Sequence, residues 1–226
     1  MSIACSTCPV RDRAACAILE EDEREELAKV GRTRRLARGE TLFTAGMSEA
    51  ACATLKSGAL KITATDAEGR ERILSLVHPS GFVGEMFGPY MRHDVVALAN
   101  SELCVFSGPS FAAAIEKYPR LSQALLRRTQ EDLFASRELL ALTGNAAAEQ
   151  RVAGSLLSLA RAASDSPCHP AKVFDLPLSR GELADMLGLT IETVSRMLTR
   201  FEKDGAIRRH GKRGIELVDP ALLPLR

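Results

Sequence analysis

Apolar and polar residues alternate in short runs over the first half of the chain, from about Arg34 to about Gly108. Examples are ALKITATD and ERILSLVH, and glycines recur between such runs at positions 39, 46, 58, 69, 81, 84 and 88. Alternation with a period of two between turn residues is typical of short antiparallel strands. We therefore expect a β-roll or sandwich within residues 20–118, which begins with a short amphipathic helix in AILEEDEREELAKV.

A different pattern covers residues 119–145, where no proline or glycine falls between Pro119 and Gly144. The run LSQALLRRTQEDLFASRELLALTG is rich in Leu, Ala, Arg and Glu, which predicts one long helix of about six turns. Its apolar positions include Leu121, Leu125, Leu133, Leu139, Leu140 and Leu142. A long helix between two domains favours a partner helix, so we expect a dimerisation helix in a symmetric homodimer. The alternative is a helix that packs only on its own domain.

Two short helical patterns, separated by Gly188, lie in LSRGELADMLGLTIETVSRMLTRFEKDGAI within residues 146–226. Ser179 followed by Glu182 forms a capping box for the first helix, and Thr190 caps the second. Six apolar residues have the spacing that packs two crossed helices over one core, as in a helix-turn-helix. They are Leu183, Ala184, Leu187, Val194, Leu198 and Phe201. The following AIRRHGKRGIELVD predicts a β-hairpin, which makes the unit a winged helix-turn-helix.

The polar side of the second helix carries the candidate DNA contacts. Arg196 can read guanine through two hydrogen bonds, Glu192 can accept from cytosine N4, and Ser195 can contact a base or a phosphate. From Arg196 to Arg213, seven basic residues face two acidic ones, a local balance of +5. The predicted DNA-binding residues are Thr190, Glu192, Thr193, Ser195, Arg196, Thr199 and Arg200. The alternative use of such a surface is an ordinary protein contact.

Composition limits the class of protein. With 226 residues, of which 46% are hydrophobic and 26% charged, the chain can bury a core for one large domain or two small ones. No stretch approaches the roughly 18 apolar residues of a membrane span, and no secretory signal is visible, so we expect a cytoplasmic protein with no membrane partner. The net charge of +1 neither demands nor excludes nucleic acid.

Three of the six cysteines are gathered in CSTCPVRDRAAC near the N-terminus, with the spacing C-x2-C-x7-C. In a reducing cytoplasm such a cluster favours metal or redox chemistry over structural disulfides. Thiolates are the usual ligands of iron–sulfur clusters, and a cubane needs four of them. On spacing alone, zinc and a thiol redox switch remain open. Residues 1–19 contain few apolar side chains, so we expect this segment to have little packing of its own.

A β-roll, a long helix and a winged helix-turn-helix, in this order, resemble the CRP/FNR family of bacterial transcription regulators, from about Glu20 to Val218. The segment LGLTIETVSRMLTRFEKDGAI is very similar to the family's recognition region, with the E-x-x-S-R pattern of its FNR branch at Glu192, Ser195 and Arg196. The resemblance implies an α+β fold with a cyclic-nucleotide-binding-like jelly roll. It also implies a homodimer that binds inverted TTGAT-type half-sites, a palindromic site in double-stranded DNA, and RNA polymerase as a partner.

The same resemblance implies a cofactor. In the oxygen-sensing branch of the family, an N-terminal cysteine triplet and one cysteine near the end of the β-roll hold a [4Fe-4S] cluster. The matching residues are Cys5, Cys8, Cys16 and Cys104. The protein is then an activator of anaerobic or microaerobic genes, in which oxygen converts the cluster towards [2Fe-2S] and apo-protein and weakens the dimer. We expect Cys52 to be a small buried hydrophobe and Cys168 to lie exposed in a loop.

A few single residues bear on other possible effectors and functions. Nucleotide binders of the family hold the cyclic phosphate with an Arg-Ser pair after a Gly-Glu, but here Gly84 and Glu85 are followed by His93 and Asp94. Because Asp94 would repel a phosphate, no cyclic nucleotide is expected. One alternative is a haem-based sensor of nitric oxide or carbon monoxide, with His78 or His93 as ligand. More distant ones are a zinc- or thiol-dependent enzyme on a β-barrel and a pure interaction module; the four histidines show no metal spacing, so no enzyme is expected.

Overall fold

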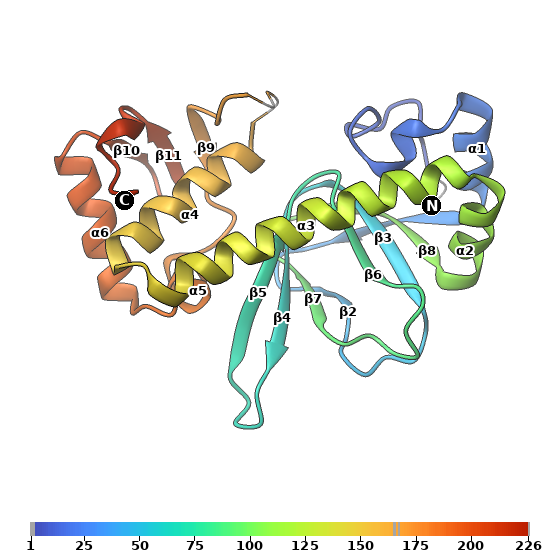
Figure 1. Ribbon diagram of the computed structural model, residues 1–226, viewed down its shortest axis with the longest axis horizontal. Helices are drawn as coiled ribbons and strands as arrows, with labels where there is room; N and C mark the ends of the chain where they lie inside the picture. Colours follow the sequence, from blue (N-terminus) through green and yellow to red (C-terminus); the bar gives the residue numbers. More distant parts are fainter. Residues whose placement is uncertain (1–2, 165, 167, 226) are drawn as a thin grey trace. The chain divides into compact units, whose positions relative to one another are not determined.

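The computed structural model describes residues 3–164, 166 and 168–225. The chain divides into two compact units, Met1–Ala135 and Ser136–Arg226 (Figure 1). The long helix α3 (Pro119–Asn145) begins in the first unit and ends in the second. Within the described ranges, no helix combines the length and the apolar character needed to cross a membrane.

The first unit contains a β-roll of two four-stranded antiparallel sheets, with strand orders β1-β8-β3-β6 and β2-β7-β4-β5. The strands are β1 (Gly31–Leu36), β2 (Thr41–Phe43), β3 (Ala51–Ser57), β4 (Leu60–Thr65), β5 (Glu71–Val77), β6 (Phe82–Glu85), β7 (Asp94–Ala97) and β8 (Ser101–Ser107). Alternate side chains point between the sheets, where Leu55, Leu60 and Leu103 are fully buried. The alternation in the sequence thus specified the strands.

A second apolar cluster covers the outer face of the β1-β8-β3-β6 sheet. It is formed by the N-terminal segment with its 3-10 turn (Ala15–Ile18), by α1 (Glu21–Lys29), by α2 (Gly108–Lys117) and by the first turns of α3. The helix α2 was not predicted, because Gly108 and Pro109 mark a break after β8. Ser107 in fact caps a new helix there by accepting from the backbone N–H of Ser110, and proline is tolerated in a first turn.

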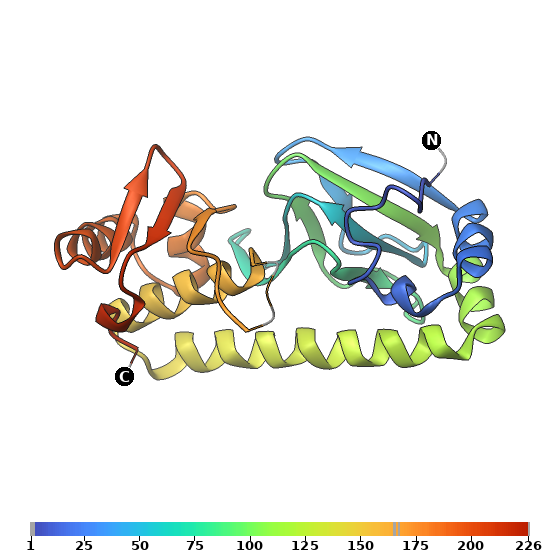
Figure 2. The ribbon, with the colours of Figure 1, turned by 90° about the horizontal axis from the view of Figure 1, so that it is seen from above.

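The expectation that the N-terminal segment has little packing of its own is wrong. Val10 is 1% exposed, Ala14 4% and Leu19 2%, so the few apolar residues of residues 1–19 are spaced to meet the sheet. Figure 2 shows this segment lying across the strands of the roll. The segment is therefore part of the first unit's core rather than a solvated tail.

The second unit contains α4 (Ala148–Ala162), α5 (Arg180–Leu187), α6 (Ile191–Lys203), the strands β9 (Val173–Asp175), β10 (Ile207–His210) and β11 (Gly214–Leu217), and a 3-10 turn at Pro220–Leu222. The capping box of α5 is present: Ser179 Oγ accepts from the N–H of Glu182, and Glu182 accepts from the N–H of Ser179. Gly188 ends α5 with a left-handed φ of 62°, a conformation that favours glycine. Thr190 caps α6.

The six predicted core residues of the two crossed helices are all buried, together with Met197. The predicted hairpin is the β10-β11 pair, which we call the wing. The strand β9 extends this sheet by pairing with β11 and was not predicted, because its three residues follow a loop rich in proline. The prediction of an α+β chain with a β-roll, a long helix and a winged helix-turn-helix is confirmed.

Candidate functional site

Four of the six cysteines line one cavity in the first unit. Cys5, Cys8 and Cys16 reach it from the N-terminal segment, and Cys104 reaches it from the middle of β8. We call it the thiol cavity. Its remaining lining is Ile3, Val10, Arg11, Ala14, Ala15, Arg24, Leu27, Ala28, Thr54, Lys56, Phe106, Phe111 and Leu121. The structure therefore brings together the four residues that the sequence analysis grouped as metal ligands.

Strand register explains why Cys104 faces this cavity. Leu103 and Val105 point into the roll, so Cys104 and Phe106 must point to the outer face of the sheet. Cys104 pairs with Thr54 of β3, whose side chain also lines the thiol cavity. The triplet is placed by consecutive turns: the N–H of Cys8 donates to the carbonyl of Cys5, and the N–H of Arg11 donates to the carbonyl of Cys8.

The donor set fits a polyatomic group. The cavity is open to solvent at one side, and its empty space is about 620 Å³ when that open solvent is included. Four thiols and three cations line it, and the described lining includes no carboxylate. Such a set matches the four thiolates of an iron–sulfur cubane. Among the described residues, no three His, Cys, Asp or Glu side chains are grouped so that they could hold a metal ion, so the four thiols share a cavity without forming a closed ligand sphere.

Burial keeps thiols of the cavity protonated when no metal is bound. Burial, together with the charge of neighbouring cysteines of the set, raises the pKa of Cys16 to about 11 and that of Cys104 to about 12. Burial likewise raises the pKa of Cys5. At neutral pH these groups are thiols, so metal binding must displace their protons and becomes weaker as the pH falls.

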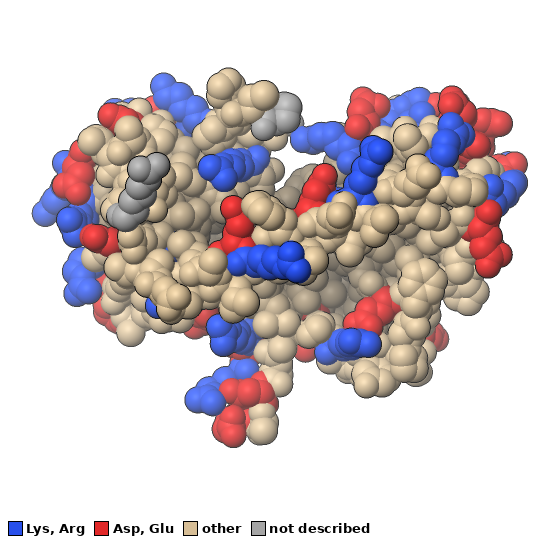
Figure 3. All heavy atoms as spheres, in the orientation of Figure 1, with Lys and Arg blue, Asp and Glu red and all other residues tan. Residues whose placement is uncertain are grey.

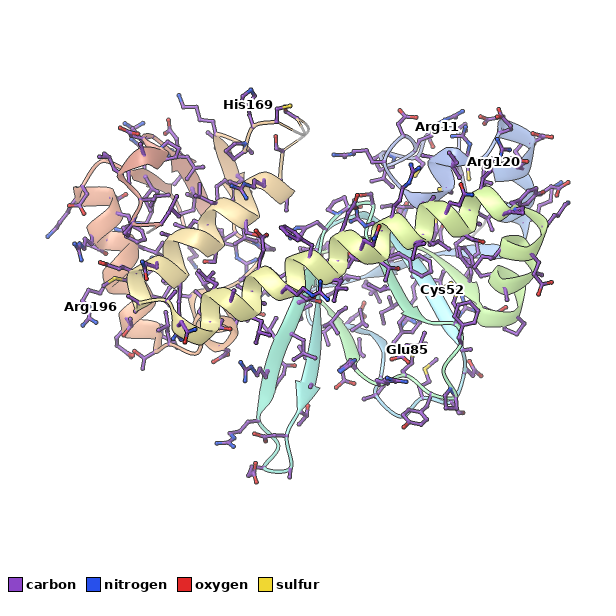
Figure 4. The ribbon with its side chains drawn as sticks, in the orientation of Figure 1. Arg11, Cys52, Glu85, Arg120, His169 and Arg196 are labelled. Atoms are coloured by element: carbon purple, nitrogen blue, oxygen red, sulfur yellow. The ribbon has the colours of Figure 1, made fainter. Side chains whose placement is uncertain are left out.

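The second unit presents the predicted DNA-reading surface on α6. Glu192, Arg196 and Arg200 are exposed, while Thr193, Ser195 and Thr199 are partly exposed. Within the described part of the chain, the side chains of Ser195 and Arg196 have no hydrogen-bond or ion-pair partner. Figure 4 labels Arg196 on the outer side of α6, pointing away from the unit, and Figure 3 shows Lys and Arg side chains along the same edge.

Several of the predicted DNA contacts are partly engaged inside the unit. Thr190 Oγ1 accepts from the N–H of Thr193, and Thr199 Oγ1 donates to the carbonyl of Ser195. Arg200 forms ion pairs with Glu149 of α4 at 2.7 Å and with Asp204 at 3.6 Å. The free polar groups at the front of α6 are thus concentrated at Ser195 and Arg196.

A further ion pair, between Glu202 of α6 and Arg209 of β10, connects the wing to α6, and the sequence did not indicate it. Glu202 Oε1 accepts from the backbone N–H of Arg209, and Glu202 Oε2 accepts from its guanidinium. These bonds lower the pKa of Glu202. The local balance of +5 already counts Glu202, but it still overstates the charge available to phosphates, because Arg200 and Arg208 pair with Glu149 and Glu216, which lie outside residues 196–213.

Comparison with known proteins shows which family has this architecture. A family model of the Crp-like helix-turn-helix domain matches residues 150–224, and one of the cyclic nucleotide-binding domain matches residues 33–118. The transcriptional activator protein FnrL of Cereibacter sphaeroides is 35% identical over 97% of this chain and 90% of its own. The chain belongs to the CRP/FNR family of transcription regulators.

Two further comparisons agree with the assignment of this protein to the CRP/FNR family. The nitrogen fixation regulation protein FixK of Bradyrhizobium diazoefficiens is 32% identical over 96% of this chain and 91% of its own. The solved structure of FixK2 from Bradyrhizobium japonicum superposes with a TM-score of 0.76 at 25% identity, covering 86% of this chain and 96% of the other. The protein is a DNA-binding transcription regulator of the FNR, FixK and Anr type and not an enzyme.

The structure also shows the surroundings of the two other cysteines and of the two carboxylates Glu85 and Asp94 in this CRP/FNR regulator. Cys52 is fully buried on β3 and Cys168 is exposed, as expected. Glu85 accepts from the backbone N–H of Arg92 at 2.9 Å, and Asp94 accepts from the N–H of Ala45 at 2.8 Å. Both carboxylates therefore hold loops of the β-roll, and Figure 4 shows Glu85 at the loop after β6.

His78, one of the two histidines that the haem alternative offers as a ligand, gives a prediction about the pH dependence of stability. Burial, together with Arg128 of α3, lowers its pKa from 6.5 to about 4. The folded protein thus keeps His78 neutral where the unfolded chain protonates it, so stability is lost as the pH falls from 6.5 towards 4. We expect the free energy of unfolding of wild type to fall, relative to that of His78→Gln, by about 2.5 kcal/mol between pH 7 and pH 4.5. Urea unfolding at both pH values measures it, and equal drops would contradict this environment.

Proposed function

We propose that this regulator activates anaerobic or microaerobic genes in response to oxygen. A [4Fe-4S] cluster bound by Cys5, Cys8, Cys16 and Cys104 would control a homodimer that binds an inverted TTGAT-type repeat. The observation that carries the proposal is the thiol cavity, where three N-terminal thiols and one thiol of β8 meet without a carboxylate. A cytoplasmic location, where thiols stay reduced, and RNA polymerase as partner belong to the same proposal.

Four thiolates in this cavity would supply the chemistry of an oxygen-labile iron–sulfur cluster. The contribution of the chain is to tie the N-terminal segment to β8. Cys16 and Cys104 pack in the same apolar cluster as Phe111 of α2 and Leu121 of α3. Because these side chains share one wall of the cavity, the way the segment is held affects the packing at the start of α3. The link from sensor to helix therefore runs through direct contacts.

The exposed side of α3 supports the dimer. Leu126, Leu133 and Leu140 are 64%, 47% and 68% exposed and recur every seven residues. A seven-residue repeat of leucine is the pattern of a helix that packs along a second helix. Two winged helix-turn-helix units joined in this way bind a palindrome much more tightly than one alone, since the second contact becomes intramolecular.

The β-roll offers support for a regulator that does not use cyclic nucleotides. Its interior is filled by apolar side chains that include Met91, Val95 and Leu103. The carboxylate of Asp94 lies where the family's phosphate-binding pair is expected, and it is engaged with Ala45. Titration of the protein with cyclic AMP is expected to leave its DNA affinity unchanged.

The function is tested by DNA binding before and after exposure to air. Protein purified without oxygen is expected to bind a duplex carrying the inverted repeat and to lose most of that affinity in air. A duplex with one scrambled half-site is the matched control. Equal affinity in both conditions would show that oxygen is not the signal.

Arg196 gives a prediction on DNA reading. Arg196→Ala is expected to weaken binding by about 1 to 3 kcal/mol per half-site and to relax the preference at one base pair. The reason is that the exposed guanidinium, which has no ion pair within the described residues, is available for two hydrogen bonds to a guanine. Competition binding with duplexes substituted at each position measures both effects. A uniform loss across all sequences would instead assign Arg196 to a phosphate.

A further inference from the structure

Two cations with little exposure face the thiol cavity. Arg24 comes from α1 with 14% of its side chain exposed, and Lys56 comes from β3 with 8% exposed. Arg11, the third cation of the lining, is 33% exposed and pairs with Glu21. A buried charge is costly unless an opposite charge compensates it, so the position of Arg24 and Lys56 calls for an explanation.

Lys56 lies on β3 between Leu55 and Ser57, where the pairing of β3 with β8 shifts by an irregularity. Its side chain lines the thiol cavity together with Thr54 of the same strand. Nζ of Lys56 donates to Glu102, which also accepts from Arg35 at 2.9 Å. Burial alone would lower the pKa of Lys56, but the hydrogen bond to Glu102 leaves it raised, so the lysine stays charged.

Arg24 is less well compensated. Its Nε is buried without a hydrogen-bond partner among the described residues, and the carboxylate with which it pairs there, that of Glu21, lies 4.0 Å from Nη2. That carboxylate is already engaged by Arg11. A buried donor left unpaired is destabilising, so a guanidinium held here indicates an acceptor or an anion on the cavity side.

The thiols are the groups that receive this charge. Arg24 and Lys56 line the same cavity as Cys5, Cys8, Cys16 and Cys104, so both charges face the sulfurs. Four thiolates carry four negative charges, which a cubane core cancels only in part. An anionic group in an apolar cavity requires nearby positive charge.

We propose that Arg24 and Lys56 form a pair of cations that compensates the negative charge of the four-thiolate site and sets the reduction potential and the iron retention of the cluster held there. This inference rests on the proposed function. Neither residue is a metal ligand; each acts through its charge on the four sulfurs. Losing either cation makes a further negative charge less favourable, so one-electron reduction becomes harder and iron is lost more readily.

The test uses Arg24→Met and Lys56→Met in the full-length protein loaded without oxygen. Lys61→Met is the control for the lysine, because Lys61 is 9% exposed but lies on β4 outside the cavity lining. Lys29→Met is the control for α1, because Lys29 is exposed on the same helix. The readouts are the midpoint potential of the cluster and the rate at which a chelator removes iron. Circular dichroism checks the fold of each variant.

We expect each cavity variant to make one-electron reduction on the order of tenfold less favourable, a shift of about 59 mV to lower potential. Chelation should become several-fold faster, while both controls remain within twofold of wild type. A loaded wild type whose cavity variants match the controls would overturn the inference alone. A wild type that holds no cluster would overturn the proposed function and the inference with it. If one cavity variant does not fold, the other decides.

Discussion

Cys104→Ser is expected to lose the [4Fe-4S] cluster and to lower the anaerobic affinity for the inverted repeat by about 100-fold or more. Among the described residues of the lining, Cys104 is the only cysteine that belongs to the β-roll, so its thiolate would be the ligand through which the cluster bridges the N-terminal segment and β8. Without it the cubane lacks one of four ligands. The loss in DNA affinity corresponds to the loss of the second, intramolecular contact when the dimer weakens.

Two substitutions control for the loss of a thiol. Cys52→Ala removes a buried cysteine from the neighbouring strand β3, and Cys168→Ser removes an exposed one from the second unit. Both are expected to keep iron, sulfide and oxygen-responsive DNA binding. Iron and sulfide content and fluorescence anisotropy with labelled duplex measure the three proteins side by side. A Cys104→Ser protein with full iron and intact regulation would refute the assignment of the fourth ligand.

Leu133→Glu is expected to make the protein monomeric at micromolar concentration and to weaken DNA binding by a similar factor. Leu133 lies in the middle of the exposed leucine repeat of α3. A carboxylate there would be buried between two apolar helix faces, which costs several kcal/mol, or at least about 100-fold in the dimer dissociation constant. Sedimentation velocity on the anaerobic protein measures the change.

Ala135→Glu is the matched control for Leu133→Glu. Ala135 is exposed and lies two residues further along α3, about 200° around the helix from Leu133. The same charge on that side should leave the dimer in place. If both variants dissociate equally, the effect arises from the charge of the helix and not from the leucine repeat.

Much of the fold followed from local sequence patterns. The period-two alternation specified the strands of the roll, and Ser179, Glu182 and Gly188 marked the ends of α5 because capping and left-handed backbone are local properties. The helix α2 was missed because Gly108 and Pro109 indicate a break, although Ser107 caps the helix locally. The strand β9 was missed because Val173–Asp175 is a strand only where β11 lies beside it, a contact with a distant segment.

The candidate site also contains residues that the sequence predicted and residues that it did not. Spacing and resemblance identified Cys5, Cys8, Cys16 and Cys104, which line one cavity. Arg24 was missed because it lies in the acidic run EEDEREEL, which has the composition of a solvated helix face. Lys56 sits in an alternating strand like any exposed lysine. Only the register of β3 and β8, and the segment folded over them, turns these charges towards the thiols.

The central claim is that the thiol cavity holds a four-iron cluster, and the direct measurement is the iron and acid-labile sulfide content of protein purified without oxygen, repeated after air is admitted. We predict about four iron and four sulfide per chain, with visible absorbance that bleaches in air as both are lost. Protein with one zinc per chain, or with no metal after anaerobic purification and reconstitution, would contradict the claim. It would leave a CRP/FNR regulator whose four gathered thiols serve another signal.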